Sequence, residues 1–325
     1  MLKLLRSTIR IICRNTSLSL IQVPKATFLC LLNFRSKYTH YVIICDHIGD
    51  FLITMGYLAE YKKEKGKKHI TVCTTSNLTN LLPLYQNSFD DYIEVPSKRL
   101  YELLALAATN FGTHILGKLK NITLINPADA FVEDSFQYIM RYPHVRLKDC
   151  IQYGCLQLQP TATFITPQSS KYGTMAKVEG VERKRTVLLC PYARAAVLDE
   201  IGIFTSLSKT LKKLGFMVLT NISDSSQEPV KGTKGVSCTL ADVFSLVETG
   251  GYVVGARSGL LDLLVYAECK MVAIYPEENK YLEFFNLSQM PQIKADVLQL
   301  KVSEDVQRDI ETIISFLIGG DGSCR

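Results

Sequence analysis

The chain has 325 residues, of which 47% are hydrophobic and 21% are charged. This balance excludes a disordered or fibrous chain, and the length predicts two domains of common size. Residues 1–38 hold seven basic residues and no Asp or Glu: Lys3, Arg6, Arg10, Arg14, Lys25, Arg35 and Lys37. Once these seven are subtracted from the 37 basic residues, the rest is nearly balanced by 31 acidic residues, so no nucleic-acid partner is expected.

The basic segment 1–38 also carries apolar residues, among them Leu2, Leu4, Leu5 and Ile9. Its apolar runs are interrupted by charge and are too short to span a bilayer. We therefore expect an amphipathic tail that lies on an anionic membrane surface, with a frayed chain start as the alternative.

The ten cysteines are scattered, mostly singly, and no Cys-x-x-Cys pair occurs. Several lie in apparent core strands: Cys45, Cys73, Cys190 and Cys269. We expect buried, reduced thiols in a cytoplasmic protein that is peripheral to the membrane if its tail binds there. Because the five histidines also show no ligand spacing, neither a metal site nor another cofactor is expected.

From residue 41 onward, short apolar runs alternate with longer amphipathic segments, which is typical of parallel sheets with crossover helices. In the first half the expected strands are 41–45, 69–73, 92–95 and 122–126. The expected helices are 50–64, closed by Gly66, and 98–109, closed near Gly112.

The second half repeats this alternation. Its expected strands are 186–191, 216–220, 235–238, 252–255 and 270–276. Its expected helices are 199–214, stopped by Gly215, then 240–248, 259–268 and 303–318. In the last helix, Ser303 is the expected N-cap, with Glu304 and Asp305 in the first turn.

A looser stretch over 143–184 separates the two halves, and we place the linker near 165–184. The expected fold is α/β, with two Rossmann-like domains that face each other across a cleft. After the tail, these domains cover residues 39–170 and 171–325. Ligands of such sheets gather at the carboxyl ends of the strands, so the cleft is the expected site.

The motif His47-Ile48-Gly49-Asp50 follows the first strand and precedes an apolar helix. Gly49 lets the backbone approach a ligand closely, and the free amides of the helix start favour an anion. Asp50 either caps the helix or acts in chemistry at the mouth of the cleft. His47 either tunes or replaces Asp50 as a base, or is a loop histidine without a partner.

A second motif, Arg257-Ser258-Gly259, follows the strand at 252–255 and precedes another helix. Amides and a hydroxyl at such a turn can hold a diphosphate, and Arg257 can pair with phosphate oxygens. The alternative is a capped turn in which Arg257 pairs with Asp262 and takes no part in catalysis.

The strand followed by HIGDFLITMGYL resembles the Gly-Asp turn of glycosyltransferase family 9, the heptosyltransferase family of GT-B fold. The resemblance extends over roughly residues 41–290, and the Ser258-Gly259 turn also matches it. This chain departs from the family at two positions, with Arg257 where the family has an acidic residue and Asp262 where it has His. These departures leave the donor's identity open.

This resemblance implies that Asp50 is the general base that takes the proton of an acceptor hydroxyl. It also implies that Arg194, in the loop after strand 186–191, faces the donor phosphates. The segment beginning at Ser237 resembles the family's stretch before the donor turn, so that Thr239 either reaches the nucleotide or caps its helix.

The sequence therefore predicts an inverting, metal-independent glycosyltransferase that moves a sugar from a nucleotide-sugar donor to a saccharide or lipopolysaccharide-type acceptor. Its expected partners are that donor and a saccharide or glycolipid. Two alternatives remain, because fold alone does not define the reaction: a nucleotide-sugar epimerase of the same fold, and a non-catalytic descendant that binds a saccharide or nucleotide.

Overall fold

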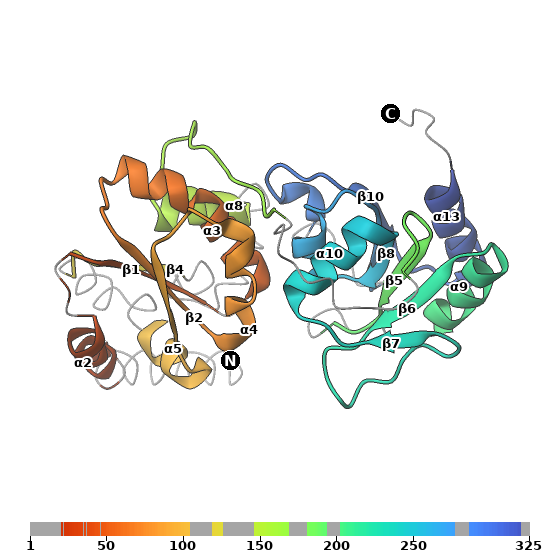
Figure 1. Cartoon of the computed structure of the whole chain (residues 1–325), viewed down its shortest axis with the longest axis horizontal. Helices are drawn as coiled ribbons and strands as arrows, with labels where there is room; N and C mark the ends of the chain where they lie inside the picture. The colour runs from red at the N-terminus through yellow and green to blue at the C-terminus, as the bar shows by residue number, and fades with distance from the viewer. Residues whose placement is uncertain are drawn as a thin grey trace, which may run out of the picture. The chain divides into compact units, whose positions relative to one another are not determined.

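The computed structural model describes residues 21, 23–34, 36, 38–45, 47–104, 119–125, 146–168, 181–193, 202–276 and 286–319 (Figure 1). The chain divides into two compact units, Met1–Ile165 and Thr166–Arg325. Each unit contains a parallel sheet with helices. In the part of the chain that is described, no helix is both long enough and apolar enough to cross a membrane.

The first unit is built on a four-stranded parallel sheet in the order β3-β2-β1-β4. The strands are β1 (His40–Ile44), β2 (Ile70–Thr74), β3 (Asp91–Glu94) and β4 (Ile122–Ile125). All residues of β1 and β2 are buried, as expected for strands covered on both faces. The four strands predicted for this half are confirmed to within one residue, except that residue 126 lies outside the described residues.

Helices cover both faces of this sheet. They are α2 (Val23–Asn33), α3 (Ile48–Glu64), α4 (Ser76–Thr79), α5 (Ser97–Leu104) and α8 (Leu147–Asp149), with a 3₁₀-helix η2 (Leu82–Tyr85) and a π-helix η3 (Cys150–Cys155). On one face α2 and α5 pack against alternate residues of β1, Tyr41 and Ile43. The other residues of β1 face the opposite side, where α3 packs.

Helix α2 corrects one expectation. The sequence assigned residues 1–38 to a separate tail, but Ala26, Cys30 and Phe34 are buried in the core of the first unit. Contacts with α5 and β1 override the local composition of the segment. Residues 1–20 lie outside the described residues, and the membrane-bound tail stays a prediction.

Helix α3 is held firmly on the sheet. Its C-terminal end is followed by Gly66 at φ +60°, the left-handed conformation that glycine adopts readily. A Cβ at Gly56 would come within 2.1 Å of Phe164, so only glycine lets this ring lie on the helix. The segment that carries Phe164 is tied to the same place by the Ile165 amide, which donates to the Gly56 carbonyl at 2.8 Å.

The second unit is built on a six-stranded parallel sheet in the order β10-β9-β8-β5-β6-β7. The strands are β5 (Thr186–Cys190), β6 (Met217–Asn221), β7 (Lys234–Val236), β8 (Gly251–Ala256), β9 (Lys270–Tyr275) and β10 (Asp296–Lys301). Five of them were predicted from the sequence. The edge strand β10 was missed, because its mixed residues DVLQLK lack the apolar run of the buried strands.

The helices of the second unit are α9 (Gly202–Lys213), α10 (Leu240–Gly250), α11 (Gly259–Leu264) and α13 (Val306–Ile318), with a 3₁₀-helix η4 (Leu287–Gln289). The predicted N-cap of the last helix is wrong. Asp305 caps it by accepting from the Arg308 amide at 3.0 Å. Ser303 instead donates its hydroxyl to Asp309 Oδ1 at 2.9 Å.

The two units reproduce the predicted α/β fold of two Rossmann-like domains. Residues 143–184 were expected to be loose, but part of this stretch is ordered as α8 and η3 inside the first unit. None of the cysteines in the described ranges forms a disulfide. Burial raises the pKa of Cys30, Cys73, Cys190 and Cys269 to about 12, so these thiols stay protonated and unreactive.

Candidate functional site

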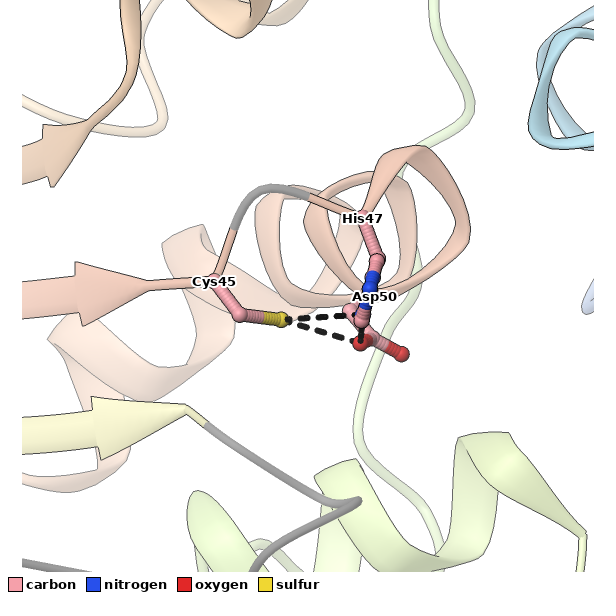
Figure 2. Close-up of side chains that lie close together, drawn as sticks. All are labelled: Cys45, His47 and Asp50. Carbon is pink, nitrogen blue, oxygen red and sulfur yellow. Dashed lines mark hydrogen bonds and ion pairs between the residues drawn. The ribbon is translucent and has the colours of Figure 1, made fainter. Parts of the chain in front are cut away.

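The first candidate site lies where β1 ends and α3 begins. Parallel strands present their carboxyl ends at one edge of a sheet, which is where such folds bind ligands. Cys45 follows β1, His47 precedes α3, and Asp50 lies in the first turn of that helix. The strand positions Cys45, the helix positions Asp50, and His47 lies between them in the chain. The three side chains converge on one point (Figure 2).

Three close approaches join these side chains. The Cys45 thiol donates to Asp50 Oδ2 at 2.9 Å, and His47 Nδ1 lies 3.3 Å from the same oxygen. Cys45 Sγ and His47 Nδ1 are 3.9 Å apart. Cys45 and Asp50 are buried, whereas the side chain of His47 is 63% exposed. His47 is therefore the solvent-facing side of an otherwise buried cluster.

The geometry answers two questions that the sequence left open. The helix begins at Ile48, and its N-cap is His47, whose backbone is extended and whose side chain makes no capping bond. Asp50 is not the cap: its carboxylate points to Cys45 and His47 instead. The interpretation of His47 as a histidine without a partner is also wrong. Gly49 lies within the first turn rather than before it.

The π-helix η3 packs against α3 and β4 near this cluster. Tyr57 on α3 donates to Gln152 Oε1 at 2.9 Å, and Gln152 donates to the Gln159 carbonyl at 2.7 Å. Burial raises the pKa of Cys150 above its ordinary value, and the charges of Asp149 and Asp50 add to this effect. The charge of Asp50 therefore acts on the Cys150 thiol in η3. This element is a wider helical turn of a type often found at functional sites.

This arrangement suits a general base. Oδ2 of Asp50 is held by a thiol and an imidazole, while its other carboxylate oxygen points away from both (Figure 2). A carboxylate fixed in this way can accept a proton from a hydroxyl placed within hydrogen-bonding distance. The sequence named His47, Gly49 and Asp50 as candidates but not Cys45, although the position of Cys45 directly after the strand was a usable signal.

The second candidate site lies at the carboxyl end of a strand in the second unit, between β8 and α11. Arg257 Nη2 donates to Asp262 Oδ1 at 2.6 Å, and Nη1 donates to the Ser258 carbonyl at 2.6 Å. Both charged side chains are buried, at 9% and 10% exposure. The structure thus brings Arg257, Ser258, Gly259 and Asp262 together. Arg257 forms the ion pair that was the expected alternative to phosphate binding.

A partly buried chain of polar side chains continues from this ion pair. Burial raises the pKa of Tyr275 to about 12, and the neighbouring Arg257 guanidinium opposes that rise. The Tyr275 hydroxyl donates to Gln299 Oε1 at 2.7 Å, and Gln299 donates to Asn286 Oδ1 at 2.8 Å. Sequence reasoning missed Tyr275 and Gln299, which are far from the motif along the chain and reach it through β9 and β10.

Two further candidates differ in outcome. Thr239 is the N-cap of α10, which is one of the two roles expected from the sequence: its hydroxyl accepts from the Asp242 amide at 3.2 Å and lies 2.6 Å from Asp242 Oδ2. Its reach to a nucleotide stays a prediction. Arg194 lies outside the described residues, so its predicted role also stays a prediction.

Two Rossmann-like units in one chain are typical of the GT-B glycosyltransferase class of fold, and the comparison with solved structures supports this fold. The ADP-heptose LPS heptosyltransferase II of E. coli superimposes with a TM-score of 0.57 and 16% identity, over 87% of this chain and 100% of that one. A family 9 glycosyltransferase from Veillonella parvula gives a TM-score of 0.54 and 13% identity, over 87% of this chain and 97% of its own.

An E. coli heptosyltransferase solved with ADP gives a TM-score of 0.52 and 11% identity, over 86% of this chain and 99% of that one. No protein-family model matches the sequence, and no curated protein matches it. The chain therefore shares the fold of the family that its Gly-Asp turn resembles, at sequence identities too low to carry over an activity.

Proposed function

We propose that this protein is a glycosyltransferase that moves a sugar from a nucleotide-sugar donor to a saccharide or lipopolysaccharide-type acceptor. The proposal rests on the Asp50 carboxylate, which Cys45 and His47 hold at the carboxyl edge of the first sheet. The similar folds, two of them those of heptosyltransferases, support the same class of reaction.

In the proposed reaction, Asp50 takes the proton of an acceptor hydroxyl while that oxygen attacks the anomeric carbon of the donor. The bond from this carbon to the diphosphate breaks, and the sugar's configuration inverts. The acceptor binds in the first unit, where His47 and Gly49 line the approach to Asp50. A base on the attacking side is the requirement of such a direct displacement.

The donor binds in the second unit, and no metal ion is needed for its departure. The diphosphate leaves against the turn at Ser258 and Gly259, where amides and basic side chains offset its charge. Arg257, oriented by Asp262, and Arg194 supply the positive charge, and Thr239 contacts the nucleotide. A cytoplasmic protein with residues 1–38 at an anionic membrane surface would meet a glycolipid acceptor there.

Incubation of the full chain with ADP-, UDP- and GDP-linked sugars and a panel of saccharide acceptors tests this proposal. Release of nucleoside diphosphate together with formation of a glycosylated acceptor is the expected result. Asp50→Asn should abolish the acceptor-dependent release while retaining donor binding, measured by thermal shift. If no nucleotide sugar shifts the melting temperature or is consumed, the transferase proposal fails.

A second candidate, a non-catalytic binder of saccharide or nucleotide, is favoured by one observation. Arg257 is buried against Asp262, so part of its hydrogen-bonding capacity is already used within the protein. Donor binding with no turnover in any acceptor mixture, together with equal affinities of wild type and Asp50→Asn, would support this candidate over the enzyme.

A further inference from the structure

We propose that Cys45, His47 and Asp50 bind one divalent transition-metal ion, of which Zn²⁺ is the best match. Within the described residues, this is the group of three potential ligands whose atoms all lie within 4.8 Å of one another. The three come from a segment of six residues, fixed by a strand at one end and a helix at the other (Figure 2).

The spacing of the ligand atoms suits a tetrahedral ion. With Zn–S near 2.3 Å and Zn–N or Zn–O near 2.0–2.1 Å, ligand atoms in a tetrahedral site lie about 3.3–3.6 Å apart. The observed separations are 2.9 Å, 3.3 Å and 3.9 Å, which bracket these values. Rotation of the exposed His47 side chain can shorten the 3.9 Å separation, and the 2.9 Å separation between Cys45 and Asp50 lengthens once the thiol proton between them is lost. The fourth position then faces solvent on the side of His47.

The charges of the ligands also favour such an ion. Binding removes the thiol proton that Cys45 now donates to Asp50, and this proton leaves to solvent. A thiolate and a carboxylate together balance the two positive charges of the metal, with a neutral imidazole as the third ligand. Sulfur and nitrogen ligands select Zn²⁺ or Co²⁺ over Mg²⁺ and Ca²⁺, which prefer oxygen ligands.

The site has a consequence that rests on the proposed function. Asp50 Oδ2 cannot coordinate a metal ion and serve as a free base at the same time, and a bound cation lowers the basicity of the whole carboxylate. Zn²⁺ therefore inhibits the transfer reaction by occupying the base, and a chelator restores it. The reaction needs no metal, and the ion acts as a regulator of the site.

Titration of the chelator-treated full chain with Co²⁺ tests the metal site without any activity assay. We expect the near-ultraviolet absorption of a cobalt–thiolate bond, saturating at one Co²⁺ per chain. Zn²⁺ should abolish this band, and excess Mg²⁺ should leave it. Cys45→Ser should remove the band, whereas Cys238→Ser, a partly exposed thiol of the second unit, should keep it. No band in wild type, or an undiminished band in Cys45→Ser, overturns the proposal.

His47→Ala provides a second variant in case Cys45→Ser does not fold, because the His47 side chain is largely exposed. Losing a direct ligand should weaken Co²⁺ binding by about tenfold or more, at least as much as losing an outer-shell partner. Unchanged affinity overturns the assignment of His47. A cobalt band in a protein without turnover keeps the metal site and removes the transferase, whereas turnover without a band does the reverse.

Discussion

The two strand-to-helix turns of this protein hold their acidic residues in opposite ways. In the first unit, the buried carboxylate of Asp50 is met by a thiol and an imidazole. In the second, the buried carboxylate of Asp262 is met by the guanidinium of Arg257. Both turns follow the carboxyl end of a parallel strand, β1 in one sheet and β8 in the other, and their acidic residues differ in the partner.

We expect this difference to separate a reactive group from a structural one. A guanidinium is always charged and stabilises the ionised carboxylate, so the pair is internally balanced. A thiol and an imidazole can each lose or gain a proton, and they leave the carboxylate able to exchange one. Chemistry is therefore expected at Asp50, while Arg257 and Asp262 first of all hold their turn together.

The largest effect is expected at the ion pair of the second turn. Arg257→Ala leaves Asp262 buried without its cation and should lower the free energy of unfolding by about 3–5 kcal/mol. Urea unfolding measures this loss. The double change Arg257→Met with Asp262→Leu should recover most of the stability, since it removes both charges. A stable single variant that loses nucleotide affinity would instead make Arg257 chiefly a phosphate ligand.

The next effect concerns the first turn. Asp50→Asn keeps the shape of the side chain but cannot take a proton, so turnover should fall by about 100-fold or more, equivalent to roughly 2.7 kcal/mol in the barrier. Steady-state kinetics and urea unfolding measure turnover and stability separately. Glu60→Gln, on the same helix, is the matched control and should retain activity. A large loss of stability in Asp50→Asn would make this turn structural, like the second one.

Low pH should lower the stability of the first unit through His40, separately from any effect on the candidate site. Burial, with a contribution from the charge of Lys67, lowers the pKa of His40 from 6.5 to about 4. The unfolded chain therefore binds a proton that the folded chain does not, and stability falls as pH drops below about 6.5. The loss should reach roughly 2 kcal/mol at pH 5.

His40→Gln should remove this part of the pH dependence, as followed by thermal unfolding between pH 7 and pH 4.5. In wild type, His40 Nε2 lies 2.9 Å from Thr123 Oγ1 and from the Tyr61 hydroxyl. An activity loss in acid that persists in His40→Gln is then not caused by His40. An unchanged slope of stability with pH would show that His40 protonates freely in the folded protein.

The smallest effect tests whether Thr239 does more than cap α10. Thr239→Ala removes the acceptor of the Asp242 amide and should cost about 1 kcal/mol of stability. Thr239→Ser keeps the hydroxyl and should restore it. Calorimetric titration with nucleoside diphosphates gives the second readout. Weaker binding in the Ala variant alone would add Thr239 to the donor site, and unchanged binding would restrict it to capping.

The sequence by itself determined the architecture, because its strands are nearly continuous apolar runs and its glycines mark helix ends. Residues 41–45 and 186–191 could be recognised without knowing what they pack against, since strands buried on both faces must be apolar. Two elements were not predicted from the sequence, the edge strand Asp296–Lys301 and the helix Val23–Asn33. Their burial depends on neighbours that are distant in the chain.

Only the tertiary structure decided which groups meet at the two turns. Their sequences show which groups are present, but whether Asp50 meets Cys45 and His47, or whether Arg257 meets Asp262, depends on side-chain directions within a few ångströms. Tyr275 and Gln299 come to the second turn from other strands of the sheet. Periodicity reports which face of an element is buried, whereas hydrogen-bond partners are fixed by packing that no local pattern encodes.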